Sequence, residues 1–177
     1  MGLHPWDTAR LDAYRVVDQA LAHYLENEHC VALGEVGIDR LRGASMAVQE
    51  ELLSVQLKIG ESLHKPVIVH CVRAWSELLS VFRKQRFTYN KAIHGYRGSL
   101  PVLERLLEEG WYISVGFYTP PELIEHIPLE QLLLESDDTQ LPIDTLYEQT
   151  AERLNISDNE LKAMVKGNIQ RFIRQEE

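Results

Sequence analysis

The sequence has little of several features that would place it at once in a class of proteins. Only two of its 177 residues are cysteines, Cys30 and Cys71, which is too few for a disulfide framework, and free thiols fit a reducing cytoplasm. No apolar run approaches the roughly 18 residues that a membrane-spanning helix needs. Residues 1–6 lack the basic end and the apolar stretch of a signal peptide. These absences predict a cytoplasmic protein with no membrane partner.

Positive charge is also scarce. The chain has 18 Lys and Arg against 27 Asp and Glu, so its formal net charge is −9. This balance excludes the broad basic surface of a protein that wraps duplex DNA, but it allows a small site that grips one phosphate. Hydrophobic residues make up 45% and charged residues 25%, a composition typical of folded domains. The length predicts a single domain over residues 1–177.

Short apolar runs alternate with amphipathic segments along the chain. The runs begin near residues 31, 67, 91, 112 and 132, and such runs are typical of strands buried on both faces of a parallel sheet. Helices are expected over residues 8–27, 45–64, 74–85, 99–110 and 121–126, followed by a helical tail with a capping box at Ser157 and Glu160. Hairpin signals such as Asn-Gly are absent. The pattern predicts one α/β domain with a parallel sheet.

Four residues of metal-binding type follow four of these strands. Glu35, His70 and His94 are expected directly after the strands at 30–34, 67–69 and 91–93, and Asp137 follows the strand at 132–134. The carboxyl ends of parallel strands are where α/β folds build their sites, and closure into a barrel would bring the four together. Such a set suits Zn²⁺, Mn²⁺ or another divalent ion. The ion would lower the pKa of a bound water and polarise a phosphoryl or carbonyl oxygen.

Other polar residues near these strand ends allow two interpretations each. Arg73 and Arg97 lie just past His70 and His94, where either could bind a substrate phosphate bidentately or be a surface arginine at a helix start. His4 could lie near the same strand ends, although by itself it is interpreted as a turn residue. Glu135 should share the face of Asp137 and act as a support or a second acid.

Six short motifs, in order, resemble those of the TatD-like metal-dependent deoxyribonucleases. Residues 34–39 (GEVGID) are similar to the "GE-[TI]-G-[LI]-D" motif of that family, and residues 133–137 (LLESD) to its "LLETD" segment. The other four motifs lie at residues 2–5 (GLHP), 69–73 (VHCVR), 94–99 (HGYRGS) and 167–172 (GNIQRF). The resemblance covers essentially the whole chain.

The resemblance implies a TIM-barrel hydrolase of the amidohydrolase type that cleaves phosphodiester bonds of DNA, often as an exonuclease. It implies one or two divalent ions, Mg²⁺, Mn²⁺ or Zn²⁺. Glu35 would bridge two ions, while His70 and His94 would hold one of them. Asp137 would bind the other ion and orient or deprotonate the attacking water, so Glu35 and Asp137 are the expected catalytic residues.

The sequence departs from this family at its amino end. Members begin with a strand that ends in an H-x-H metal pair, followed by a second strand, and this chain contains no H-x-H. The resemblance therefore predicts an incomplete TIM (β/α)8-type barrel whose first two strands are missing. An open barrel edge would require a second copy, another chain or a rearrangement.

Two alternatives to the nuclease stay open at this point. One is an impaired remnant or subunit that binds one metal and acts by association. The other is an amidohydrolase that acts on a small C–N or ester substrate, although Arg73 and Arg97 favour phosphate.

Overall fold

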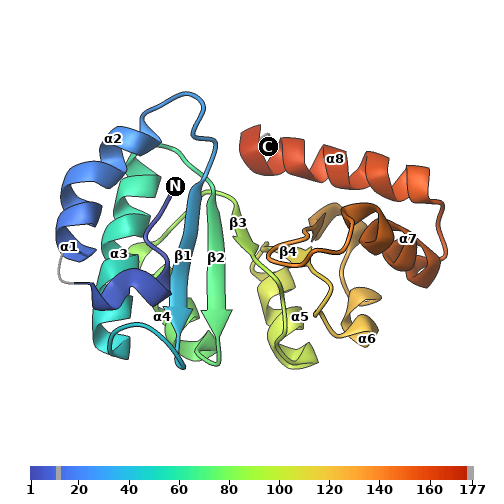
Figure 1. Cartoon of the computed structure of the whole chain (residues 1–177), viewed down its shortest axis with the longest axis horizontal. Helices are drawn as coiled ribbons and strands as arrows, with labels where there is room; N and C mark the ends of the chain where they lie inside the picture. The colour runs from blue at the N-terminus through green and yellow to red at the C-terminus, as the bar shows by residue number, and fades with distance from the viewer. Residues whose placement is uncertain (11–12, 175–177) are drawn as a thin grey trace. The chain divides into compact units, whose positions relative to one another are not determined.

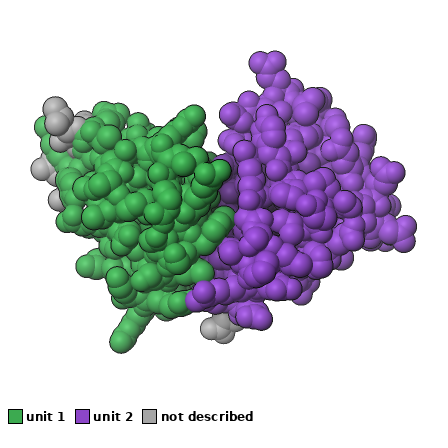
Figure 2. All heavy atoms as spheres, turned by 90° about the horizontal axis from the view of Figure 1, so that it is seen from below, with its two compact units in different colours: residues 1–91 green, residues 92–177 purple. Residues whose placement is uncertain are grey.

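Strands and helices alternate along the chain in the computed structural model, which describes residues 1–10 and 13–174 (Figure 1). The chain divides into two compact units, residues 1–91 and 92–177 (Figure 2). Every strand pairing within these units is parallel. The predicted α/β class with parallel strands is therefore confirmed.

Unit 1 contains the first two strands and the helices that cover them. Its strands are β1 (Leu33–Asp39) and β2 (Val67–Val72), paired with Leu33 opposite Val67 and Val36 opposite Val69. These four side chains are fully buried. The helix α3 packs against β1, and α4 packs against α3 and β2. The helical segments of unit 1 are η1 (Pro5–Ala9), α1 (Ala13–Val16), the π-helical η2 (Val17–Leu21), α2 (Ala22–Leu25), α3 (Met46–Ser62) and α4 (Trp75–Gln85).

Unit 2 contains the remaining strands. β3 (Lys91–Ile93), which begins at the last residue of unit 1, pairs with β4 (Tyr112–Val115), and β4 pairs with β5 (Leu132–Leu134). The register aligns Ile93, Ile113 and Leu132, all fully buried. The helix α8 packs against β5 and α7. The helical segments here are α5 (Leu100–Glu108), α6 (Pro121–Ile124), η3 (Leu129–Gln131), α7 (Ile143–Leu154) and α8 (Asp158–Arg174).

Most element positions agree with the sequence expectations, but the first helix does not. Residues 5–9 form a separate 3₁₀ turn, and α-helix begins at Ala13. Residues 11 and 12, which belong to the predicted helix, lie outside the described residues. No helix in the described part of the chain is long and apolar enough to cross a membrane.

The first two strands also run further than predicted. Glu35 and His70 lie within β1 and β2 and not after them, because pairing continues through Gly37 opposite His70 and Asp39 opposite Val72. A side chain at Gly37 would place its Cβ 1.9 Å from the carbonyl oxygen of His70. The absence of a side chain at Gly37 therefore allows the two strands to stay paired where the apolar run of the sequence has already ended.

Candidate metal-binding groups

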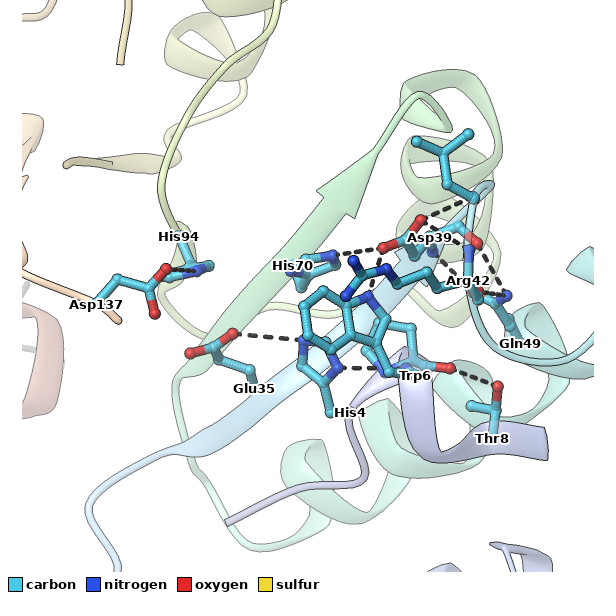
Figure 3. A network of polar contacts seen from close by, with 12 residues as sticks. His4, Trp6, Thr8, Glu35, Asp39, Arg42, Gln49, His70, His94 and Asp137 are labelled. Atoms are coloured by element: carbon cyan, nitrogen blue, oxygen red, sulfur yellow. Dashed lines mark hydrogen bonds and ion pairs between the residues drawn. The ribbon is translucent and has the colours of Figure 1, made fainter. Parts of the chain in front are cut away.

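Unit 1 gathers His4, Glu35 and His70 into one group of potential ligands. One ligand atom from each residue lies within 4.8 Å of the others. The Nε2 atom of His4 lies 3.7 Å from Oε2 of Glu35 (Figure 3), which is too far for a hydrogen bond but close enough for two ligands of one ion. Glu35 and His70 come from neighbouring strands, and His4 precedes η1.

Buried hydrogen bonds hold His4 in this group. Gln56 of α3 accepts the backbone N–H of Leu3 (2.6 Å) and donates to the carbonyl of Leu3 (3.2 Å). The Nδ1 atom of His4 accepts the N–H of Trp6 (3.2 Å), so the ring turns Nε2 toward Glu35. The interpretation of His4 as a turn residue is right but incomplete, because the neighbouring Leu3 is held by Gln56, which lies 53 residues from Leu3 along the chain.

The buried carboxylate of Asp39, the last residue of β1, contacts one member of this group. Its Oδ2 accepts the indole N–H of Trp6 (2.6 Å) and contacts Nε2 of His70 (3.2 Å). Burial raises the pKa of Asp39, but the hydrogen bonds from Trp6, Leu41 and His70 lower it by more, so the pKa lies below its usual value. The sequence showed Asp39 only as the last letter of a motif.

The neighbouring cysteine does not belong to the group. Burial raises the pKa of Cys71 to about 12, so its side chain is a neutral thiol near pH 7 and a poor metal ligand. Cys71 is also not among the three residues whose ligand atoms gather here.

Unit 2 gathers His94, Glu135 and Asp137 into a second group. His94 directly follows β3, and both carboxylates follow β5, as the sequence predicts. The two ring nitrogens of His94 face different carboxylates. Nδ1 lies 2.6 Å from Oε1 of Glu135, and Nε2 lies 3.6 Å from Oδ2 of Asp137 (Figure 3). Gly95 permits the approach of Glu135, since a Cβ there would lie 3.1 Å from the same Oε1.

The carboxylate of Glu135 gives the clearest sign that this group suits a cation. Its Oε1 is buried and accepts no hydrogen bond from the described residues, despite its short distance to His94. A buried carboxylate oxygen without a donor is costly. Carboxylate oxygens and imidazole nitrogens are ligands that Zn²⁺ and Mn²⁺ accept, so the residues present fit a divalent ion.

The two arginines proposed as phosphate ligands are both exposed. The guanidinium of Arg97 lies 4.6 Å from the centroid of the Tyr118 ring, within the range of a cation–π contact. Arg73 has a left-handed backbone (φ 52°), and its carbonyl accepts the Nε–H of Arg40 (2.8 Å). Both side chains follow a candidate ligand histidine by three residues, in the same unit as that histidine.

The four residues predicted as ligands therefore fall into two pairs, one in each unit. Glu35 and His70 are joined by His4, and His94 and Asp137 are joined by Glu135. The sequence pattern identified candidate ligands that lie within strands (Glu35 and His70) or after them (His94 and Asp137). It did not select His4 as a candidate ligand, because no local pattern reports a contact made by folding.

Comparison with known proteins relates the chain to one family. A family model described as "TatD related DNase" matches residues 1–174. The chain is 32% identical over 146 residues to the 3'-5' ssDNA/RNA exonuclease TatD of Edwardsiella piscicida, covering 77% of this chain and 55% of that protein. It is 32% identical over 154 residues to the uncharacterized metal-dependent hydrolase YjjV of Escherichia coli, covering 81% of this chain and 58% of that protein.

A solved structure shows the same architecture. The crystal structure of YJJV, a TatD homolog from Escherichia coli, superimposes with a TM-score of 0.85 at 26% identity, over 98% of this chain and 75% of that one. The chain thus spans little more than half the length of the two curated relatives. The superposition covers 75% of the solved YJJV chain.

Proposed function

Since the chain belongs to the TatD-related DNase family, whose model matches residues 1–174, we propose that it is a metal-dependent nuclease. Its substrate class is single-stranded DNA or RNA, from which it releases nucleotides by hydrolysis of phosphodiester bonds. One relative is named as an ssDNA/RNA exonuclease and another as a metal-dependent hydrolase. The observation that carries the proposal is the group of His4, Glu35 and His70, whose ligand atoms lie within 4.8 Å of one another.

The proposed ligands follow from the two groups. In unit 1, Glu35 and His70 hold a divalent ion together with His4. In unit 2, His94 and Asp137 act with Glu135, whose buried Oε1 lies 2.6 Å from Nδ1 of His94 and accepts no well-directed hydrogen bond from the described residues. Mg²⁺, Mn²⁺ and Zn²⁺ are the proposed ions, one or two per protein, because each accepts carboxylate oxygens.

The chain's own side chains accept the proton of the attacking water and bind the substrate phosphates. A bound divalent ion lowers the pKa of water and polarises a phosphoryl oxygen. The carboxylate of Asp137 is 41% exposed, so it is accessible to accept the proton of the attacking water as a general base. Glu35 is the second proposed catalytic carboxylate. Arg97 and Arg73 bind the phosphates of the substrate through their guanidinium groups.

The cellular compartment is proposed from the state of the two cysteines. Cys30 and Cys71 are both free thiols, which supports a reducing compartment such as the cytoplasm. The association of this chain with a second copy or another chain stays a prediction, and sedimentation velocity would measure it.

The nuclease proposal is tested with a 5′-labelled single-stranded oligonucleotide. We expect metal-free protein to be inactive and Mg²⁺, Mn²⁺ or Zn²⁺ to start the release of nucleotides. Glu35→Gln and His94→Ala should reduce the rate at least about 100-fold, because each removes a ligand of a proposed ion. Thermal unfolding of each variant would establish that it is folded.

Matched variants separate a loss of ligands from a general effect of substitution. Glu130 and His126 are exposed residues outside both groups, so Glu130→Gln and His126→Ala should keep full activity. If no metal stimulates hydrolysis above the level of the Glu35→Gln protein, the nuclease proposal fails. Metal binding near one equivalent without turnover would favour the non-catalytic subunit, and hydrolysis of small esters alone would favour the amidohydrolase.

A further inference from the structure

The carboxylate of Asp39 is more firmly held than any other acidic group beside the unit 1 ligands. Its residue is only 3% exposed. Oδ1 accepts the backbone N–H groups of Leu41 (2.8 Å) and Arg42 (3.2 Å). Oδ2 accepts the indole N–H of Trp6 (2.6 Å) and lies 3.2 Å from Nε2 of His70 (Figure 3). Three N–H donors and the Nε2 atom of His70 thus surround the two oxygens, and Asp39 is not among the residues whose ligand atoms gather around Glu35.

The backbone at Asp39 is fixed from the opposite side by Gln49 of α3, which is 1% exposed. The amide oxygen of Gln49 accepts the N–H of Asp39 (2.7 Å), and its Nε2 donates to the carbonyl of Asp39 (3.0 Å). The same Nε2 reaches the carbonyls of Arg42 (2.9 Å) and Ala44 (2.8 Å). The loop that follows β1 is therefore tied to α3, and the carboxylate cannot move away from His70 without breaking several buried hydrogen bonds.

This arrangement favours a proton on one particular nitrogen of His70. A carboxylate only accepts, so the 3.2 Å contact with Oδ2 is a hydrogen bond when Nε2 is protonated. In the neutral ring the lone pair then lies on Nδ1. The side chain of Trp6 adds to this effect, because its N–H takes up a further lone pair of Oδ2 and keeps that oxygen an acceptor toward His70.

We propose that Asp39 is a positioning residue for His70: it fixes the imidazole in the Nε2–H tautomer and thereby selects Nδ1 as the nitrogen offered to a divalent ion in the group of His4, Glu35 and His70. The proposal rests on the metal-dependent function proposed above. A carboxylate behind a ligand histidine sets its tautomer and orientation and raises its basicity, and loss of such a partner typically lowers metal affinity 10- to 100-fold.

The first test uses Asp39→Asn, which replaces one oxygen by an NH₂ group of nearly the same size. The backbone amides of Leu41 and Arg42 hold the remaining oxygen at the Oδ1 position, so the NH₂ group faces His70 and donates to Nε2. Long-range ¹H–¹⁵N spectra of the metal-free protein report the tautomer, and His70→Gln identifies the signals of His70. We expect Nε2–H in the unsubstituted protein and Nδ1–H in Asp39→Asn, together with a 10- to 100-fold weaker affinity for Mn²⁺ or Zn²⁺ by calorimetry.

Trp6→Phe is the matched control. It keeps an aromatic side chain at position 6 and removes the indole N–H that Asp39 accepts. The carboxylate of Asp39 still faces Nε2 of His70, so the tautomer should stay Nε2–H. An Nδ1–H tautomer in the unsubstituted protein would overturn the proposal, as would an unchanged tautomer and metal affinity in a folded Asp39→Asn. If Asp39→Asn does not fold, the spectrum of the unsubstituted protein decides alone.

These measurements separate the positioning role from the proposed function. The tautomer is recorded without metal or substrate, so a protein with no nuclease activity still gives a result. An active nuclease with His70 in the Nδ1–H form would overturn only the role of Asp39. An inactive protein with the Nε2–H form that changes in Asp39→Asn would leave that role standing and remove the nuclease.

Discussion

Single residues determine the chemistry of this chain through the atoms that folding brings close to them. The carboxylates and histidines at the strand ends could be predicted from sequence, since a polar residue after an apolar run stands out. The partners of these residues could not, because the approach of His4 to Glu35 involves long-range hydrogen bonds such as those between Leu3 and Gln56. The same limit applies to Trp6 and Asp39, which are 33 residues apart.

Arg97 carries a prediction at this scale. Lysine at this position would keep the charge but lose the planar group that stacks on Tyr118 and binds phosphate bidentately. We expect Arg97→Lys to raise KM for an oligonucleotide about tenfold with little change in kcat, because phosphate binding is lost equally from the ground and transition states. Steady-state kinetics with a labelled oligonucleotide would measure both constants.

Three further variants decide whether a change in KM reports contact between Arg97 and the substrate. Tyr118→Phe keeps the ring and should behave like the unsubstituted protein, and Arg83→Lys, on the exposed side of α4, should have no effect. An unchanged KM in Arg97→Ala would show that Arg97 does not contact the substrate.

Helices and strands place these residues, and their centres were easier to predict than their ends. The strands β3 and β5 occupy the predicted residues because short apolar runs define them. The strands β1 and β2 continue beyond their apolar runs, since pairing through Gly37 depends on a close approach to His70 that no local pattern shows. The start of α8 was predicted fully, because Ser157 and Glu160 form their capping box within one turn.

Asn168 carries a prediction for the anchoring of β5 by α8. The residue is 1% exposed, and its Nδ2 donates to the carbonyls of Leu129 (2.7 Å) and Leu132 (2.6 Å). Asn168→Ala would leave the buried carbonyl of Leu132 and the partly buried carbonyl of Leu129 without this donor. It should lower the free energy of unfolding by about 2–4 kcal/mol. Urea unfolding would measure the change. Gln170→Ala, at an exposed position of the same helix, should change it little, and equal effects of the two variants would contradict the anchoring.

The capping box of α8 gives a prediction about pH. The hydrogen bonds from the hydroxyl and backbone N–H of Ser157 lower the pKa of Glu160 from 4.5. The folded state therefore favours the charged carboxylate, so its contribution to stability is complete above the unfolded-state pKa near 4.5 and is lost as the pH falls through the lower folded-state pKa. Thermal unfolding should show that the stability difference between the unsubstituted protein and Ser157→Ala shrinks as the pH falls from 6 to 3. A constant difference would contradict this assignment.

At the scale of the whole molecule, metal binding should appear as stability. An ion that binds the folded chain alone stabilises it by about 2.7 kcal/mol at 100 times its dissociation constant. For a chain of this length, that corresponds to a rise in Tm of roughly 5–10 °C. We expect Mn²⁺ or Zn²⁺ to raise the Tm of the EDTA-treated protein by this amount and EDTA to reverse the rise.

The combined variant Glu35→Gln/Asp137→Asn tests where this stabilisation comes from. It removes one carboxylate from each ligand group, so it should respond to the metal much less, while His126→Ala should respond fully. A full rise in Tm in the combined variant would place the ion elsewhere in the protein.

The close approach of β1 and β2 at Gly37 also limits how this protein can evolve or be redesigned. Any side chain at position 37 would overlap the backbone of His70 and force apart the strands that carry Glu35 and His70. In a random library selected only for folded chains, with no demand for catalysis, glycine should therefore still be the residue recovered at this position. An invariant glycine here would record the geometry of the backbone and would say nothing of whether the protein is still an enzyme.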